Sequence, residues 1–545
     1  MKTITCNKMI MLTALFAGIY MNSLAQSREF SVSPLRYAGI HSLSNTPGES
    51  DAYLLLQTAS GGNWNIDLVD TSLNQIRSTS IEAPAYSFFN QLCHNGEYTL
   101  MSFVVNAFST SVTYIVLDGN GQEVARTTRT DVPNLRRGEQ FFPSVYPHPT
   151  QGFIIIQSTG KTRSAGYVAE HVDEHLNTLW SKEFSLSNAQ VHAYDVFSSH
   201  DRLYILEATE RRGKTQNARL QCIDLNDYTH LYTMDLTDSN NSFFPTALLP
   251  MQDGSIALAG TYFKGERISG RNNQGIFFFY VDVDGNTAGM DLHPWSELRS
   301  TLRTSVPDWF FKVMPDVYIH AIEPNMDGSF TAIAELYRYS GEVRREDDDG
   351  KREQYHRIRM LDFMLFSFDV DGRILQTERI ERPHMVLKLD SEFSGGSESL
   401  AHNAGQGPLR RARAMKKAGA FTYRFHNKTD DRFNLAFMSY ENKTHYAYMM
   451  DLRHGNDAQK TDLRHAKPAF ISYLQIIDLC TNQSGFGFIL SELNTRSFDD
   501  SEVYWRGILP GKQGNMLTYE FMPLNGKLQL NVVSFDKSLP QTSNP

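Results

Sequence analysis

The feature that most constrains the fold of this chain is a two-strand unit that recurs along its length. In each copy, a short β-rich run is followed by a turn of Asp, Asn or Gln with Gly and then by a second run of branched or aromatic residues. Clear copies run from Phe142 to Ile156, from Phe244 to Leu258 and from Tyr318 to Phe330. Asp-Gly and Asn-Gly between such runs are strong hairpin signals, because these residues tolerate a positive φ. The sequence therefore predicts an all-β repeat protein.

A second unit, an apolar strand that ends in aspartate, gives the period of the repeat. The marker residues are Asp70, Asp118, Asp173, Asp224, Asp282 and Asp369. Successive markers are 48, 55, 51, 58 and 87 residues apart. Four strands with short turns need about 40–50 residues, which is the blade length of WD40 and kelch propellers. The spacing predicts a β-propeller with one four-stranded blade per period.

The number of blades follows from the strands that begin each unit. These strands start near Tyr37, Tyr86, Phe142, Ala193, Phe244, Tyr318, Phe421 and Ser472. We therefore expect eight blades, with seven as the alternative number. Tandem sandwich domains are an alternative architecture, because they also fit the scarcity of helical signals. Residues after Met516, including Leu528–Val533, are expected to join the sheet of the first blade, because such a closure removes two exposed edges at once.

Two insertions interrupt the period. Residues 291–316 contain Pro294-Trp295 and predict a short helix packed on a blade. Residues 388–419 combine a Ser-Gly-Gly-Ser stretch with the basic positions Arg410, Arg411, Arg413, Lys416 and Lys417. We interpret residues 388–419 as a mobile, solvated loop with a short basic helix, and docking of a partner or a membrane surface is the functional alternative. The charged stretch 344–351 predicts the tip of an extended hairpin.

The first 25 residues have the layout of a secretory signal peptide. A basic start precedes an apolar run of 13 residues, Met9–Met21, which is shorter than the ~20 residues of a membrane-spanning helix. The small residues Ser23 and Ala25 predict cleavage after Ala25. We expect residues 26–545 to form one propeller domain, with no transmembrane segment in the mature chain. The protein is expected to be exported and to be periplasmic or extracellular at the cell surface.

Composition excludes some classes of function. The formal net charge is −9 and the charged residues are well mixed, whereas nucleic-acid binding needs concentrated Lys and Arg to displace counterions. We therefore expect no nucleic-acid partner. The cysteines outside the first 25 residues, Cys93, Cys222 and Cys480, are too few for a disulfide framework. They are expected to be buried thiols.

One segment matches a catalytic pattern. His171-Val172-Asp173-Glu174-His175 has the H-x-x-E-H form of inverted zinc proteases. On a helix, residues four apart share one face at ~6 Å and hold a single metal ion. Here the segment occupies the strand-and-turn position of the repeat, and along a strand residues four apart lie ~13 Å from each other. We interpret the segment as a turn, with a catalytic metal as the alternative.

The other motifs also favour structure over chemistry. The segments Asp282–Asn286 and Asp369–Gly372 resemble calcium loops, but glycine falls at position four and position twelve is His293 or Ile380, whereas an EF-hand needs glycine at six and glutamate at twelve. Hairpin turns explain them better. Histidines such as His192 and His320 are expected to be structural residues of strands. The sequence thus assigns no catalytic, cofactor-binding or metal-binding residue and implies no cofactor.

The turn chemistry carries one resemblance to a known group of proteins. The stretch Ser23-Leu24-Ala25-Gln26 and the repeated Asp-Gly and Asp-x-Asp-Gly turns resemble uncharacterised exported proteins of Bacteroidota with propeller-like folds. This resemblance implies a location in the cell envelope or at the surface, and it supplies no catalytic residues. Blade-like strands run nearly to the end of the chain with no separate sorting module, which favours the periplasm.

These observations lead to two functional hypotheses. The first is a non-enzymatic binding or scaffold propeller of the cell envelope that recognises an unknown protein or glycan ligand through loops at one face of the ring. The alternative is a carbohydrate-active or other hydrolytic propeller whose acidic residues converge at the central channel. A pair of facing carboxylates ~5–10 Å apart is the geometry that hydrolysis of a glycoside requires.

Overall fold

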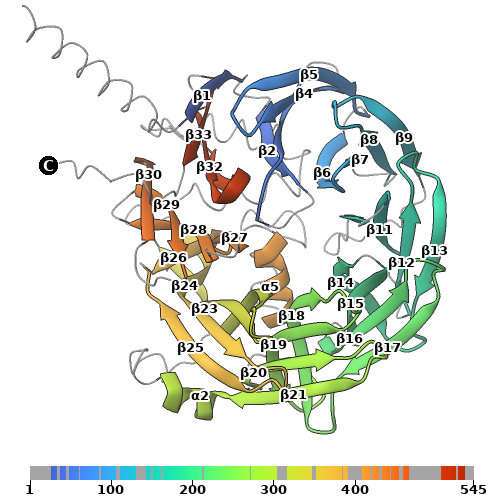
Figure 1. The fold of residues 1–545 in the computed structure, drawn as a ribbon, viewed down its shortest axis with the longest axis vertical. Helices are drawn as coiled ribbons and strands as arrows, with labels where there is room; N and C mark the ends of the chain where they lie inside the picture. Colours follow the sequence, from blue (N-terminus) through green and yellow to red (C-terminus); the bar gives the residue numbers. More distant parts are fainter. Residues whose placement is uncertain are drawn as a thin grey trace, which may run out of the picture.

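Eight β-sheets stand in a ring around a common axis (Figure 1). The computed structural model describes residues 26–32, 37–44, 48–59, 62–84, 87–105, 111–130, 143–148, 151–160, 164–199, 201–211, 214–269, 272–302, 316–346, 352–382, 384–390, 408–417, 420–428, 433–441, 444–452, 458–465, 505–522 and 526–533. Neighbouring strands within each sheet are antiparallel. The prediction of an eight-bladed propeller is confirmed, and the alternatives of seven blades or tandem sandwiches are wrong.

The first four blades each consist of four strands that are consecutive in the chain. From the inner to the outer strand they are β2 (Tyr37–Leu43), β3 (Ala52–Thr58), β4 (Asn63–Asp70) and β5 (Gln75–Glu82) in blade 1; β6 (Ser87–His94), β7 (Thr99–Val105), β8 (Ser111–Leu117) and β9 (Glu123–Arg129) in blade 2; β10 (Ser144–Pro147), β11 (Phe153–Ser158), β12 (Tyr167–Val172) and β13 (Thr178–Phe184) in blade 3; and β14 (Gln190–Ser198), β15 (Arg202–Arg211), β16 (Lys214–Asp224) and β17 (His230–Leu236) in blade 4.

Blades 5 to 7 continue in the same order, and blade 6 has a fifth strand that pairs with its third. Their strands are β18 (Asn241–Pro250), β19 (Ile256–Lys264), β20 (Asn273–Val281) and β21 (Thr287–Pro294) in blade 5; β22 (Asp316–Pro324), β23 (Phe330–Glu346), β24 (Arg352–Phe368), β25 (Ile374–Ile380) and β26 (Met385–Asp390) in blade 6; and β27 (Tyr423–Lys428), β28 (Phe433–Glu441), β29 (Thr444–Asp451) and β30 (Ala458–His465) in blade 7.

Blade 8 closes the ring with strands from both ends of the described chain. It contains β31 (Trp505–Pro510), β32 (Met516–Met522) and β33 (Lys527–Val533), and its outer strand is β1 (Gln26–Ser31). β1 and β33 are antiparallel, with Gln26 opposite Val532 and Ser31 opposite Lys527. The expected pairing between the two ends is therefore present, but its assignment to the first blade is wrong. β1 pairs only with β33 among the described strands, so the early strand completes the last blade.

The expected strand starts agree with the inner strands of the first seven blades. Tyr37 begins β2, and Ala193, Phe244 and Tyr318 lie within β14, β18 and β22. Tyr86 and Phe142 lie outside the described residues, directly before β6 and close to β10, and Phe421 lies two residues before β27. The eighth start, Ser472, also lies outside the described residues, and the inner strand of blade 8 is β31.

In blades 1 to 6, the turn after the third strand is held by the marker aspartate. Asp118 Oδ1 accepts hydrogen bonds from the backbone N–H of Asn120 (2.9 Å) and Gln122 (2.8 Å). Asp282 Oδ1 accepts the same two bonds, from Asp284 (3.0 Å) and Asn286 (2.8 Å). A carboxylate that caps its own turn in this way selects the hairpin locally. The interpretation of the calcium-like segments as hairpin turns is confirmed.

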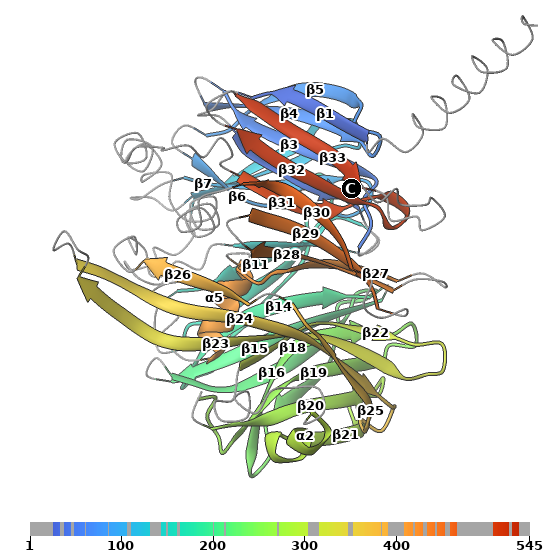
Figure 2. The ribbon, with the colours of Figure 1, turned by 90° about the vertical axis from the view of Figure 1, so that its left-hand side faces the viewer.

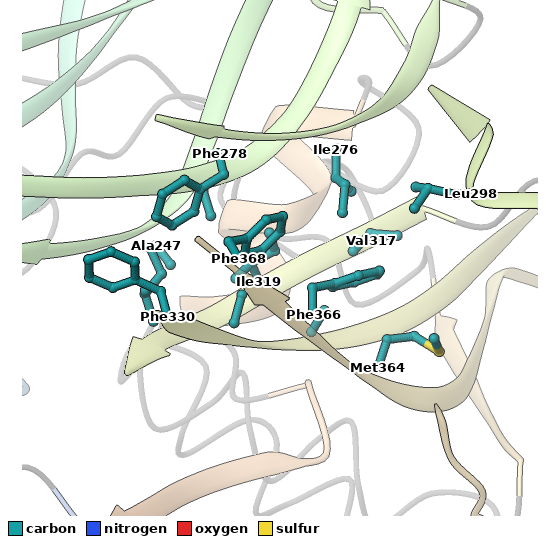
Figure 3. Close-up of a cluster of buried hydrophobic side chains, with 14 of the residues drawn as sticks. Ala247, Ile276, Phe278, Leu298, Val317, Ile319, Phe330, Met364, Phe366 and Phe368 are labelled. Atoms are coloured by element: carbon teal, nitrogen blue, oxygen red, sulfur yellow. The ribbon is translucent and has the colours of Figure 1, made fainter. Parts of the chain in front are cut away.

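Apolar packing between blades holds the ring together. All seven residues of the third strand β8 are buried, whereas residues of the outer strand β5 are mostly exposed or half-buried. Between blades 5 and 6, the ring of Phe278 lies 5.3 Å from that of Phe330 and 4.8 Å from that of Phe368 (Figure 3). Full burial of a phenylalanine contributes about 1.5–3 kcal/mol. Each blade therefore depends on both neighbours for its stability.

The two insertions contribute helices. Within residues 291–316, α2 (Trp295–Leu302) packs Trp295 and Leu298 into the apolar cluster between blades 5 and 6. Within residues 388–419, α5 (Pro408–Lys417) lies on the inner side of the ring (Figure 1). In the described part of the chain, no helix has the length and apolar character needed to cross a membrane.

Blade 6 also departs from the regular blade at one face of the ring. Its strands β23 and β24 are 17 residues each and project beyond the ring (Figure 2). Glu346 lies opposite Arg352 at the last described pair of this hairpin, in agreement with the expected hairpin tip at 344–351. β26 pairs with the projecting part of β24, from Tyr355 to Met360. One face of the propeller thus carries a three-stranded extension.

We predict that the closing strand is a main source of stability. Phe30 on β1 is buried in the cluster between blades 8 and 1, so Phe30→Ala should lower the free energy of unfolding by about 3–5 kcal/mol. Glu29→Ala is the matched control, because Glu29 lies on the same strand with 44% of its side chain exposed and pairs with Lys527. Its effect should stay below about 1 kcal/mol. Urea unfolding of both variants checks this, and equal losses would contradict it.

Candidate functional site

The H-x-x-E-H segment lies on a strand and its following turn, as the repeat predicted. His171 is buried in β12, where its ring nitrogens contact the Tyr228 hydroxyl (3.0 Å) and the Gln151 carbonyl (2.7 Å). His175 lies in the turn after β12, and 60% of its side chain is exposed. The two imidazoles therefore do not share a face as they would on a helix.

The cysteines behave as buried thiols. Cys93 and Cys222 are both free and buried, and burial raises the pKa of both, that of Cys222 to about 11. A thiol with such a pKa is a weak nucleophile at neutral pH, because the thiolate is the reactive form. Cys480 lies outside the described residues.

A recurrent β-bulge organises the inner wall of the ring. In six blades the register between the inner and second strands skips one residue, and five of these residues are Asn90, Tyr194, Thr246, His320 and Arg424. Asn90 donates to the Pro143 carbonyl of the next blade (2.9 Å), and Tyr194 donates to the Pro245 carbonyl of the next (3.2 Å). Thr246 accepts from the Ile319 N–H (3.0 Å). In these three blades the bulge thus directs a side chain toward the next blade.

Between blades 6 and 7 the bulge belongs to a buried ionic cluster centred on Glu335. This carboxylate on β23 is fully buried and pairs with the Arg382 guanidinium at 2.7 Å. His320 Nε2 donates to its other oxygen at 3.1 Å. Thr422 donates its hydroxyl (2.7 Å) and its backbone N–H (3.1 Å), and the Tyr423 N–H donates at 3.2 Å. The lone pairs of Glu335 are therefore fully used, and the start of β27 is fixed to blade 6.

The electrostatics of the Glu335 cluster follow from burial and pairing. Burial acts to raise the pKa of Glu335, but the Arg382 charge and the hydrogen bonds from His320 and Thr422 lower it to about 2. Burial lowers the pKa of His320, so His320 donates as a neutral imidazole at neutral pH. The expected structural role of His320 in a strand agrees with these contacts.

A second hydrogen-bonded chain runs beside this cluster. The Tyr423 hydroxyl lies 2.6 Å from His426 Nδ1, and His426 Nε2 lies 2.6 Å from Glu323 Oε1. The Tyr423 ring stacks on His320, with centroids 4.3 Å apart. A carboxylate that orients an imidazole beside a hydroxyl resembles the geometry that activates a nucleophile. Burial raises the pKa of Tyr423, so the phenol keeps its proton and donates to His426.

Helix α5 packs on this region of the inner wall. Leu409, Ala412 and Met415 are buried, and the cluster that they join includes Phe244, Tyr318, Tyr337 and Phe421. The interpretation of residues 388–419 as a solvated loop is therefore wrong for residues 408–417. The physical reason is the apolar stripe of α5, which the ring buries. Residues 391–407 lie outside the described part of the chain.

Ion pairs anchor two basic side chains of α5, Arg411 and Lys416. Arg411 donates to Asp316 at 2.9 Å and lies over the Tyr339 ring, 4.5 Å from its centroid. Lys416 pairs with Asp195 of β14 at 2.5 Å. Burial raises the pKa of Asp316, and Arg411 opposes that rise. Two of the basic residues that indicated a solvated or docking helix, Arg411 and Lys416, thus make contacts within the chain.

Sequence reasoning missed the ionic residues of this site, because no short motif contains them. The partners Glu335 and Thr422 are 87 residues apart, and Lys416 and Asp195 are 221 apart. One signal was available. Glu335 interrupts the apolar run Ile333-Ala334-Glu335-Leu336, and a glutamate inside a buried strand requires a partner. Such a residue marks a polar junction between blades, although it does not name the partner.

The fold and this inner-wall cluster define an eight-bladed β-propeller whose blades 6 and 7 are joined by buried charges. The sequence from residue 66 to residue 462 matches the model of a family of unknown function, DUF6770. The chain belongs to this family. No protein of curated function matches it.

Solved structures with similar folds include proteins of unrelated kinds. A protein of unknown function from Bacteroides caccae is 10% identical, with a TM-score of 0.23 over 44% of this chain and 77% of that chain. A europium-containing methanol dehydrogenase is 8% identical, with a TM-score of 0.39 over 94% of each chain. The propeller domain of the Trilobed protease from Pyrococcus furiosus is 10% identical, with a TM-score of 0.29 over 64% of this chain and 98% of that one. These likenesses do not bear on function.

We predict that Glu335 stabilises the fold in a pH-dependent way. At pH 7, Glu335→Gln should lower the free energy of unfolding by about 3–5 kcal/mol, because Arg382 would remain as a buried cation without a counter-charge. The pKa of Glu335 lies at about 2, below its ordinary value of 4.5. The stabilisation by the carboxylate is therefore complete above pH 4.5 and is lost as the pH falls toward 2. Urea unfolding across this range should show the two proteins converging.

Glu381→Gln is the control for this prediction. Glu381 also pairs with an arginine, Arg379, but 76% of its side chain is exposed. Its substitution should change the free energy of unfolding by less than about 0.5 kcal/mol at every pH. A Glu335→Gln protein as stable as the wild type at pH 7 would contradict the assigned role of the cluster.

Proposed function

We propose that this protein is a non-enzymatic binding or scaffold propeller of the cell envelope that recognises a protein or glycan ligand at one face of its ring. The observation that carries the proposal is the pairing of four carboxylates in the described part of the inner wall. Glu335 pairs with Arg382, Asp316 with Arg411 and Asp195 with Lys416, and Glu323 contacts His426. A hydrolase of the glycosidase type needs carboxylates that are available to water and substrate, and these four are engaged within the chain.

The shape of the molecule supports recognition at one face. The extension of β23, β24 and β26 projects from the ring on one side (Figure 2), whereas the other described blades have hairpins of ordinary length. Loops and extensions that a rigid scaffold holds in place are common positions for binding residues. The extension gives this face of the propeller a surface that the regular repeat does not provide.

The proposed location rests on the start of the chain. The closing strand β1 begins at Gln26, so cleavage after Ala25 would leave its pairing with β33 intact. An exported propeller of this kind would be completed by its new first residues. We predict that N-terminal sequencing of the protein purified from its native envelope fraction begins at Gln26. Recovery of Met1 in a cytosolic fraction would contradict the export proposal.

The alternative function, hydrolysis, has one specific contact in its favour, the Glu323–His426–Tyr423 chain.

We predict that the purified protein binds its ligand and releases it unchanged. A glycan and protein array identifies ligands, and mass spectrometry of each ligand after prolonged incubation detects turnover. Glu323→Gln should leave binding within about twofold, because Glu323 acts on His426 and not on a ligand. Time-dependent cleavage that Glu323→Gln and Tyr423→Phe both abolish would overturn the binding proposal in favour of hydrolysis.

A further inference from the structure

Arg424 differs from the other cationic residues near the inner ends of blades 6 and 7. Arg382, Arg411 and Lys416 each pair with a carboxylate at 2.5–2.9 Å. Among the residues that the structure describes, Arg424 has no carboxylate partner. Its Nη1 donates to the backbone carbonyls of Phe421 and Tyr423, the latter at 3.0 Å. The Nε and Nη2 groups are left without a protein acceptor in the described part of the chain.

The position of Arg424 is rigid. It is the bulge residue of β27, between Tyr423 and Phe425. The two residues before it, Thr422 and Tyr423, donate their N–H groups to the buried Glu335. Arg424 is half-buried as a residue, and its strand β27 lies, like α5, on the inner side of the ring (Figure 1). A cation held in this way loses little conformational freedom when it binds an anion.

The surroundings of Arg424 add further binding groups. Tyr519 of β32 lies opposite Gly507 of β31, the inner strand of blade 8, and its hydroxyl fills the space where a Cβ of residue 507 would stand. β31 contacts β27, the strand of Arg424, and the positive charge of Arg424 opposes the rise in the pKa of Tyr519 that burial causes. Among the described residues, the half-buried Tyr519 has no hydrogen-bond partner for its hydroxyl. Aromatic faces, a free hydroxyl and positive charge are thus brought together.

We propose that Arg424, with Tyr423 and Tyr519 beside it, binds the anionic group, a carboxylate or a sulfate, of an acidic saccharide. This proposal deepens the proposed binding function and rests on it. The free Nε–H and Nη2–H groups form one edge of the guanidinium, which matches the two oxygens of such an anion and holds them with charge-assisted hydrogen bonds. The tyrosine rings supply apolar surface for the saccharide, and the Tyr519 hydroxyl serves its polar groups, because the Tyr423 hydroxyl is bonded to His426.

The charge of the whole protein argues for one anionic group on an otherwise neutral ligand. The formal net charge of the chain is −9, so a long polyanion would be repelled by the rest of the surface. The other cations of the cluster are already neutralised by Glu335, Asp316 and Asp195. The inner wall therefore offers a single strong anion contact, which suits a saccharide with one acidic substituent.

The test is a glycan array with matched sets that differ at one substituent, followed by titration calorimetry of the glycans that bind. Each set holds a neutral glucose-terminated glycan, its glucuronate counterpart and its 6-sulfated counterpart. We expect the wild-type chain to bind an acidic member more tightly than its neutral partner. Arg424→Gln should reduce that affinity by about 10- to 100-fold, which corresponds to the loss of a charge-assisted contact. Comparison of the glucuronate and 6-sulfated members of each set shows whether the site binds a carboxylate or a sulfate.

Two further variants control the experiment. Arg424→Lys keeps the charge but lacks the planar fork, so it should lose less affinity than Arg424→Gln and should fold if the latter does not. Arg373→Gln removes an arginine that is 72% exposed in an outer turn and should bind like the wild type. Equal binding of acidic and neutral partners by the wild type, or unchanged affinity in folded Arg424 variants, would overturn the site. Binding of neutral glycans or proteins alone would overturn the site but leave the binding function intact, whereas cleavage would overturn both.

Discussion

The fold depends on the fact that each blade presents two apolar faces and covers neither by itself. In β3, the consecutive residues Leu54, Leu55 and Leu56 are all buried, although successive side chains of a strand point to opposite faces of the sheet. Leu54 and Leu56 belong to the cluster between blades 1 and 2, and Leu55 belongs to the cluster between blades 8 and 1. Every sheet needs a neighbour on both sides, so the row of blades is stable only as a closed ring.

The polar junction between blades 6 and 7 has a counterpart between blades 3 and 4, where the buried Glu207 accepts a hydrogen bond from Tyr167 and pairs with Arg219. Buried ion pairs often stabilise a protein no more than apolar residues of the same volume would. The contribution of Glu335 and Arg382 is therefore positional, since they attach the N–H groups of Thr422 and Tyr423 to blade 6. This junction follows the 388–419 insertion, where the chain returns to the ring after leaving its regular path. The charges define where β27 must begin, which an apolar contact would do less specifically.

The sequence alone predicts the features whose causes are local. Gly254 and Gly328 adopt φ values of +82° in their turns, so the Asp-Gly pairs announce these hairpins directly, and the marker aspartates cap the turns that follow the third strands. The exchange of β1 into blade 8 and the packing of α5 have no local cause. Arg411 and Asp316 are 95 residues apart, and the same basic run would be solvated if the ring did not bring Asp316 and Asp195 beneath it. Glu335 shows only that a partner is needed.

The inner bulge shows how one repeated backbone feature supports different chemistry in each blade. The register skips one residue in the same way in each of these strands, but the residue is Asn90, Tyr194, Thr246, His320 or Arg424. The first three bond to the next blade directly, and His320 both stacks on it and bonds to Glu335. Arg424 bonds instead to its own strand. The bulge geometry does not depend on the side chain, so a bulge residue that does not join two blades can bind a ligand instead. Among the bulge residues of the described inner wall, Arg424 is the one that does not join two blades.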